Sequence, residues 1–273
     1  MTGLTTTIQS GFARSRSEAL HPRLFPDAGW WCPSLQSPGG TRLHDLRGGN
    51  WGTLTNMDSA TDWVVSGGRG ALDFDGSNDR AETTATYSGL ISGKIFTLSF
   101  WMRTIATNTN AYPFAFGSSA SDTPYCGFRM STTGAGTIAL FFRDNAGNFV
   151  VPGDATVVNN GQWNHVVAVA NGLTAQLYVN GRASGSASSI GSLGASTANR
   201  VTIGALGRIS VVAFYSGLVD DARIYRDPLT LGDVRQLWQL GRGNMPTVRK
   251  RRYTEEAAAT TNRRRRLICG SNC

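Results

Sequence analysis

The sequence lacks several common features, and each absence excludes a class of protein. No apolar run approaches the roughly 18 residues that span a bilayer, and the opening MTGLTTTIQSGFARSRSEAL has no apolar segment typical of a secretory signal. We therefore expect neither a membrane span nor a secretory signal. The four cysteines are too few and too scattered for a disulfide framework, and no Cys/His spacing matches a zinc site.

Charge is also scarce, and it is unevenly placed. Charged residues make up 16% of the 273 residues, and the formal net charge is +8. Nine basic residues lie from Arg242 onward, against Glu255 and Glu256, which leaves residues 1–241 with 17 basic and 16 acidic side chains. The basicity therefore belongs to the C-terminal tail, and the rest of the chain predicts no broad basic face.

Glycine, by contrast, is abundant with 33 copies, and hydrophobic residues reach 40% of the chain. Short apolar stretches alternate with turn signals. The segment Ile95–Arg103 alternates large apolar residues with others, and Asn180-Gly181 is typical of a tight hairpin turn. At least nine strands of this kind are followed by one late helix, capped at Thr230 and ended by Gly241. This pattern predicts an all-β sandwich.

Three segments follow one another in a recognisable order: ALDFDGSNDRAET, then FTLSFWMR with GQWNHVVAVANGLTAQLYVNG, then FYSGLVDDARIYRDPLTLGDVRQL. Together they resemble the laminin G-like, concanavalin A-like jelly-roll family. The resemblance implies a two-sheet antiparallel jelly-roll sandwich with ligands held by rim loops or on one sheet face. Members bind glycans, proteins or calcium, so the resemblance implies the fold without naming the ligand.

We predict three regions: residues 1–42 form an N-terminal arm and irregular lead-in, 43–241 the sandwich with its short C-terminal helix, and 242–273 an extended Arg-rich tail. A neutral jelly roll followed by NRRRRLICG is similar to proteins of tailed-phage and environmental viral genomes. Virion proteins assemble in the host cytoplasm, which agrees with the missing signal segment.

The sequence predicts no enzyme. Sugar-cleaving enzymes of this sandwich type resemble one another in an E-x-D-x-x-E strand that places two carboxylates across the scissile bond, and no such strand is present. Asp220 and Asp221 are neighbours, which we expect to point to opposite faces of a strand. Asp73 and Asp75 share a face, where turn capping or a surface position is the simpler interpretation, and His165 is interpreted as a packed core residue.

Calcium is the one cofactor hypothesis, with no cofactor as its alternative. Ca²⁺ takes six to eight oxygen ligands from flexible loops. Asp45 and Asn50 lie in a Gly-rich loop that resembles a metal-ligating loop of some family members, and Asp220 could approach it in the folded sandwich. Arg47, within the same loop, departs from that pattern.

Aromatic side chains are the usual platform for glycans. Trp30, Trp31 and Trp51 fall in the irregular N-terminal segment. The other four tryptophans have strand or helix spacing and are expected in the core; they are Trp63, Trp101, Trp163 and Trp238.

The basic tail has three readings: a solvated tail, an anchor on an acidic partner through bidentate arginine–carboxylate pairs, or, less favoured, a nucleic-acid contact. The residues that would make an anion-contacting anchor are Arg249, Lys250, Arg251, Arg252, Arg263, Arg264, Arg265 and Arg266.

We expect a non-enzymatic binding or structural protein, a decoration or adhesin-like component on the surface of a phage virion that also binds glycans. Its partners would be capsid or tail proteins, contacted through the arm and the tail, and host-surface glycans; nucleic acid and membranes are not expected. It would be oligomeric in that assembly. The alternative is a free-standing extracellular lectin module, and a glycoside hydrolase is the minor alternative.

Overall fold

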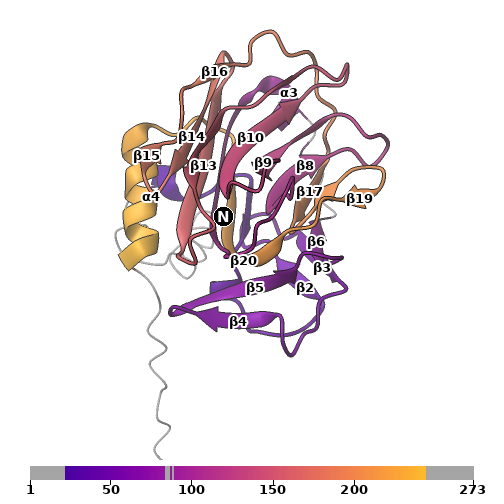
Figure 1. The fold of residues 1–273 in the computed structure, drawn as a ribbon, viewed down its shortest axis with the longest axis vertical. Helices are drawn as coiled ribbons and strands as arrows, with labels where there is room; N and C mark the ends of the chain where they lie inside the picture. The colour runs from indigo at the N-terminus through magenta and orange to yellow at the C-terminus, as the bar shows by residue number, and fades with distance from the viewer. Residues whose placement is uncertain (1–21, 84–86, 88, 244–273) are drawn as a thin grey trace, which may run out of the picture.

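Two large antiparallel sheets pack face to face, and one helix lies on the outside (Figure 1). This computed structural model describes residues 22–83, 87 and 89–243. The predicted all-β, two-sheet sandwich with a short C-terminal helix is confirmed.

Sheet A has nine strands, and its central strand β7 pairs with β13 on one side and β20 on the other. Its order is β15 (Arg182–Ala183), β14 (Thr174–Val179), β13 (Asn164–Asn171), β7 (Ile95–Arg103), β20 (Ser216–Tyr225), β5 (Arg69–Asp75) and β4 (Trp63–Ser66), with β1 (Gly29–Trp31) on β20 and β16 (Ser188–Ser189) on β14.

Sheet B also has nine strands, and a separate two-stranded hairpin lies against it. The order is β11 (Phe149–Val150), β10 (Thr137–Arg143), β9 (Tyr125–Met130), β8 (Phe114–Gly117), β17 (Arg200–Ile203), β6 (Arg80–Thr83), β3 (Trp51–Thr55) and β2 (Arg42–His44), with β12 (Gly153–Val157) on β10. The hairpin consists of β18 (Leu206–Gly207) and β19 (Val211–Val212).

The core fills the space between the sheets because each strand alternates its side chains. In β7, Phe96, Leu98, Phe100 and Met102 point inward and are fully buried, as the alternation of Ile95–Arg103 predicted. Burying each such side chain stabilises the fold by about 1.5–3 kcal/mol relative to leaving it in water. The intervening residues of β7 therefore point to the outer face of sheet A.

Helix α4 (Leu231–Gly243) covers part of that outer face. Its start is the predicted capping arrangement: the Thr230 hydroxyl accepts from the Asp233 amide at 3.2 Å, and the Asp233 carboxylate accepts from the Thr230 amide at 2.9 Å. Val234 and Leu237 pack with the outward-facing Val167 of β13. The other helical segments in the described part of the chain are short: η1 (Pro22–Leu24), η2 (Pro33–Leu35) and α3 (Leu90–Gly93).

The predicted hairpin at Asn180-Gly181 joins β14 to β15. Both residues have positive φ, 52° and 75°, as a two-residue type I′ turn requires.

The description of residues 1–42 as an arm and irregular lead-in is wrong for residues 29–31. Gly29–Trp31 is strand β1, which pairs with β20 in the register Gly29↔Ile224 to Trp31↔Ala222. Trp31 is completely buried in the core between the sheets. This segment joins sheet A because the Trp31 side chain is buried and because β5 leaves residues 222–224 of β20 available for pairing. The sandwich therefore begins upstream of residue 43.

The predicted helix end at Gly241 and the tail boundary at residue 242 are also wrong, because α4 continues through Arg242 to Gly243. The predicted arm before residue 22 and the rest of the predicted tail, from residue 244, lie outside the described residues.

Candidate ligand-binding pocket

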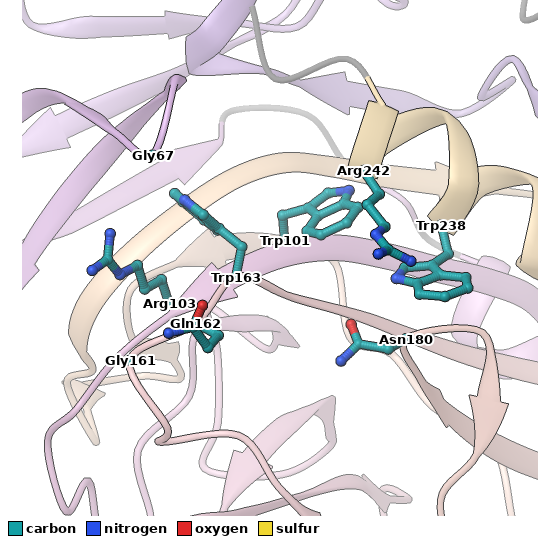
Figure 2. Close-up of a pocket in the computed structure, with 9 residues that line it drawn as sticks. All are labelled: Gly67, Trp101, Arg103, Gly161, Gln162, Trp163, Asn180, Trp238 and Arg242. Carbon is teal, nitrogen blue, oxygen red and sulfur yellow. The ribbon is translucent and has the colours of Figure 1, made fainter.

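A hollow of about 360 Å³ opens on the outer face of sheet A, beside the C-terminal end of α4 (Figure 2). Its walls come from the β4–β5 turn, strand β7, the segment before β13, the end of β14 and helix α4. The lining residues are Gly67, Trp101, Arg103, Gly161, Gln162, Trp163, Asn180, Trp238 and Arg242.

Strand alternation puts Trp101 and Arg103 in this wall. Their neighbours Phe100 and Met102 point into the core, so both face outward from β7. Trp101 is 3% exposed and stacks on His165 of β13 at 5.0 Å between ring centroids. His165 is buried and its Nε2 lies 2.8 Å from the Ser99 hydroxyl. It is a packed residue as predicted, under α4 rather than between the sheets.

Arg69 lies beneath the tryptophans and is fully buried. Its Nη1 donates to Asp220 Oδ2 at 2.7 Å, and its Nη2 donates to the Gly241 carbonyl at 2.7 Å. Its guanidinium carbon lies 4.2 Å from the centre of the Trp101 ring and 5.4 Å from that of Trp163. One side chain thereby connects strand β5, strand β20, the end of α4 and two walls of the pocket.

The β4–β5 turn fixes the third side of the pocket. Gly67 and Gly68 have φ values of 57° and 78°, which a two-residue hairpin turn needs at both positions. The Trp163 indole donates to the Ser66 carbonyl at 2.9 Å, and the Arg103 guanidinium donates to the Ser66 hydroxyl. The hydrogen bond from its indole therefore fixes the orientation of the half-buried Trp163 at the edge of the hollow.

The opposite wall is Trp238 of α4, which is half-buried. Gly181 packs under its ring: a Cβ on Gly181 would stand 3.1 Å from the indole. The Arg242 guanidinium lies 5.4 Å from the ring centre. Figure 2 shows Trp101 between Trp163 on one side and Trp238 with Arg242 on the other.

Polar groups complete the pocket. The Asn180 amide is fixed, because its oxygen accepts from the His165 backbone at 2.9 Å and its nitrogen donates to Asn164 at 2.9 Å. Gln162 and Arg242 are exposed. None of the lining residues is a carboxylate. Indole faces, one amide and two guanidinium groups suit a ligand with C–H faces and oxygen acceptors.

The tryptophans are distributed differently from the sequence expectation. Trp30 and Trp31 are fully buried, and the Trp30 indole donates to Asp221 at 2.7 Å. Trp163 and Trp238, expected in the core, instead line the pocket. That expectation was wrong because strand and helix spacing predicts which residues share an apolar face but not which face it is. Sheet A has two apolar faces, one toward the core and one under α4. The sequence did contain one signal for the pocket: Trp101 is out of phase with the inward-facing residues of β7 and therefore points outward.

The expectation that Asp220 and Asp221 face opposite sides is also wrong. Val219 and Ala222, on either side of them, both point into the core. The register against β7 shifts between Asp220 and Arg223, and Asp221 has a φ of 59°. This bulge adds a residue, so both carboxylates lie on the outer side. Each carboxylate is held by a buried arginine, Asp220 by Arg69 and Asp221 by Arg223 at 2.9 Å.

The three residues of the calcium hypothesis fall into two groups. Asp45 and Asn50 close one loop: the Asp45 amide donates to the Asn50 carbonyl at 2.7 Å, and both side chains border Gly48. Asp220 belongs to the Arg69 pair and also accepts from the Ser34 hydroxyl at 3.0 Å. These contacts supply donors rather than oxygen ligands, so they do not fit a cation at Asp220.

Clustering of acidic side chains gives the calcium hypothesis no further support. Among the residues that the structure describes, no three His, Cys, Asp or Glu side chains cluster as a metal site requires. Calcium at Asp45 and Asn50 stays a prediction. The Asp75–Asp79 turn has its own explanation: Asp75 Oδ1 accepts from the Ser77 and Asn78 amides at 2.7 and 3.2 Å, which is the predicted turn chemistry.

Comparison with known proteins agrees with this architecture. A family model described as the concanavalin A-like lectin/glucanases superfamily matches residues 75–235, more than half of the chain. The chain belongs to this superfamily. No curated protein sequence matches it. In the described part of this superfamily member, no helix is long and apolar enough to cross a bilayer.

Two solved structures illustrate the shared fold. Domain 4 of AbnA, a GH43 extracellular arabinanase from Geobacillus stearothermophilus solved in complex with arabinotriose, is 18% identical. It aligns over 77% of this chain and 97% of its own, with a TM-score of 0.57. The botulinum neurotoxin serotype D binding domain is 12% identical over 80% of this chain and 53% of its own, with a TM-score of 0.59. At these identities the likeness concerns the fold alone.

Proposed function

We propose that this protein binds carbohydrate, without cleaving it, in the tryptophan pocket on the outer face of sheet A. The observation that carries the proposal is one open hollow with the half-buried Trp163 and Trp238 on either side, the nearly buried Trp101 between them, and exposed polar groups beside them. Sugar rings present C–H faces that stack on indoles and hydroxyls that bond to amides and guanidinium groups. The AbnA domain with the similar fold is described in complex with arabinotriose, which supports this class of ligand.

The absence of catalysis is part of the proposal. Glycoside hydrolysis usually needs two carboxylates on either side of the scissile bond. The residues that line the pocket include none. Asp220, the partner of the Arg69 that lies beneath the tryptophans, is buried and ion-paired at 2.7 Å, so it has no access to a bound sugar.

We further propose that the protein is a surface component of a larger assembly such as a phage virion. Support comes from the sequence: nine basic residues from Arg242 onward follow a nearly neutral body. A run of arginines suits contact with an acidic partner surface, because each can form bidentate pairs with carboxylates. In this proposal the tail holds the protein in the assembly, and the pocket faces outward to glycans.

A glycan array followed by calorimetry on the full chain tests the carbohydrate proposal. We expect binding to at least one oligosaccharide, with an affinity that falls at least about tenfold in Trp238→Ala. Trp51→Ala removes a half-buried tryptophan from sheet B and serves as the matched control, with an expected change of less than about twofold. No binding to any glycan, or equal losses in the two variants, would contradict the proposal.

A further inference from the structure

We infer that the pocket selects acidic carbohydrate, specifically oligosaccharides that carry the carboxylate of a uronic acid. This inference rests on the proposed function and names its ligand class. The charged residues around the pocket, rather than its aromatic rings, support it.

Every charged residue in the segments that build the pocket is an arginine. These segments are residues 66–69, 101–103, 161–182 and 234–243, which contain no Asp, Glu or Lys. Arg103 and Arg242 line the hollow itself. The others are Arg69 beneath it, Arg182 in β15 and Arg235 on α4.

The nearest acids do not cancel this charge at the pocket surface. Asp220 is fully buried and neutralises Arg69, so among the residues that the structure describes no acidic side chain pairs with Arg103 or Arg242. Asp233 belongs to the first turn of α4, about 13 Å along the helix axis from Arg242, where it caps Thr230. A ligand in the hollow therefore meets a positive potential.

The helix itself raises an objection, because the C-terminal end of a helix carries partial negative charge that repels anions. Arg69 reduces this repulsion by binding to the helix end. Its Nη2 donates to the Gly241 carbonyl, one of the last carbonyls of α4, at 2.7 Å. Arg242, in the same last turn, adds a second positive group. At the pocket end of α4, Arg69 thus satisfies a carbonyl group while Asp220 balances its charge, and Arg242 supplies the uncompensated positive charge.

The position of Arg242 suits a carboxylated sugar in particular. Its guanidinium lies 5.4 Å from the centre of the Trp238 ring. The guanidinium covers one face of this ring and Gly181 lies under the other. A sugar in the hollow would therefore lie beside the Trp238–Arg242 pair, where the carboxylate that projects from the edge of a uronic acid ring would meet the exposed guanidinium. Arginine pairs with a carboxylate through two parallel hydrogen bonds, which a neutral hydroxymethyl group cannot form.

Matched ligand pairs test this inference on the full chain by calorimetry. The probes are trisaccharides of galacturonate, glucuronate and mannuronate, each paired with its methyl ester, which keeps the sugar and removes the charge. We expect at least one acid to bind about tenfold more tightly than its ester. Arg242→Gln should abolish that difference by weakening the acid far more than the ester, and Arg242→Lys should retain only part of the difference.

Two controls separate the pocket from general charge attraction. Arg182→Gln removes an exposed arginine that does not line the pocket and should leave the preference intact. Simultaneous replacement of Arg263, Arg264, Arg265 and Arg266 by Gln removes charge from the tail and should also leave it intact. Loss of the preference in either control would overturn the inference.

The outcomes also distinguish the inference from the function on which it rests. If neutral sugars, arabinotriose included, bind as tightly as the acids, the inference fails and the carbohydrate proposal stands. If no sugar binds, both fail. If polyglutamate or single-stranded DNA competes as well as the uronates do, the pocket recognises negative charge in general, and the inference is overturned.

Discussion

The outer faces of the two sheets carry the same kinds of side chain and use them in opposite ways. On sheet B, Tyr125, Phe141 and Phe149 stack on one another at 5.3 and 5.1 Å between centroids, and Arg129 lies over Phe141 at 4.3 Å. The β18–β19 hairpin packs beside them through Leu206. Tyr125 and Phe141 are buried within this stack, and Phe149 at its end is exposed, so the rings form a continuous stack without a hollow between them.

On sheet A the rings are kept apart. Arg69 sits beneath Trp101 and Trp163, and Gly181 supports Trp238 from the other side. The result is a hollow rather than a stack. Arginine and aromatic content therefore does not distinguish a face with a hollow from a packed one; the spacing set by buried supports does.

The largest effect is expected when the support under sheet A is removed. Arg69→Met leaves Asp220 as a buried, unpaired carboxylate, which should lower the free energy of unfolding by about 3–5 kcal/mol. Urea denaturation measures it. Adding Asp220→Asn should recover part of the loss, and a single variant as stable as the wild type would contradict the role given to Arg69.

The stack on sheet B should respond in stability alone. Phe141→Ala removes a ring that is 5% exposed, and we expect a loss of about 3 kcal/mol in urea denaturation. Glycan affinity, measured below the unfolding transition, should stay unchanged. A weaker affinity would show that sheet B, and not sheet A, contributes the ligand site.

A pair of glycine variants sharpens the comparison at the edge of the pocket. Gly181 and Gly172 both have positive φ, 75° and 92°, so alanine at either should cost about 1 kcal/mol in thermal or urea unfolding. Only Gly181→Ala places its methyl group against Trp238. We expect weaker glycan binding for Gly181→Ala alone, and equal binding in both variants would contradict the support role of Gly181.

The rim of sheet B offers a test by pH. Burial disfavours the ionised form of Asp144, but hydrogen bonds from Asn148, Gly194 and Ala146 outweigh it and lower the pKa of Asp144 below 3.8. A lowered pKa contributes stability that is present above the unfolded value and is lost as pH falls through the folded value. Asp144→Asn should therefore be less stable than wild type at pH 7.

The same variant should approach the wild type in stability only as the pH falls from 3.8 through the lowered pKa of folded Asp144, where the wild-type carboxylate also becomes uncharged. Unfolding curves from pH 7 down to the acid limit of folding measure the difference. A gap between the two proteins that does not depend on pH would contradict the assignment of ionised Asp144 as an acceptor.

The smallest effect concerns metal. Asp220 is held by Arg69, and no cluster of three acidic or metal-binding side chains occurs among the described residues. We expect added EDTA to leave the melting temperature unchanged, as measured by thermal unfolding. A clear drop that calcium restores would show that Asp45 and Asn50 do bind a cation.

The fold was largely predictable because its signals are local. The alternation of Ile95–Arg103, the Asn180-Gly181 turn and the Thr230 cap each follow from neighbouring residues. Strand β1 was missed, since Gly29–Trp31 is too short to show a period and becomes a strand only by pairing with β20. The bulge at Asp221 was missed for the same reason: it is a property of the pairing with β7.

The pocket depended on contacts between segments distant in sequence. Trp101, Trp163 and Trp238 come from β7, the lead into β13 and α4, and only the packing of α4 on the outer face of sheet A brings them together. Sequence spacing alone predicted a core position for each. The absence of acids from their neighbourhoods was visible in the sequence, but its meaning required the fold.

The most direct test of the account is an NMR titration of the indole N–H signals of the full chain. The uronate trisaccharides and arabinotriose serve as ligands, and single Trp→Phe variants assign the signals. The account predicts that the signals of Trp163 and Trp238 shift on binding while that of Trp51 on sheet B does not. Shifts confined to Trp51, or no shift at saturating ligand, would contradict it.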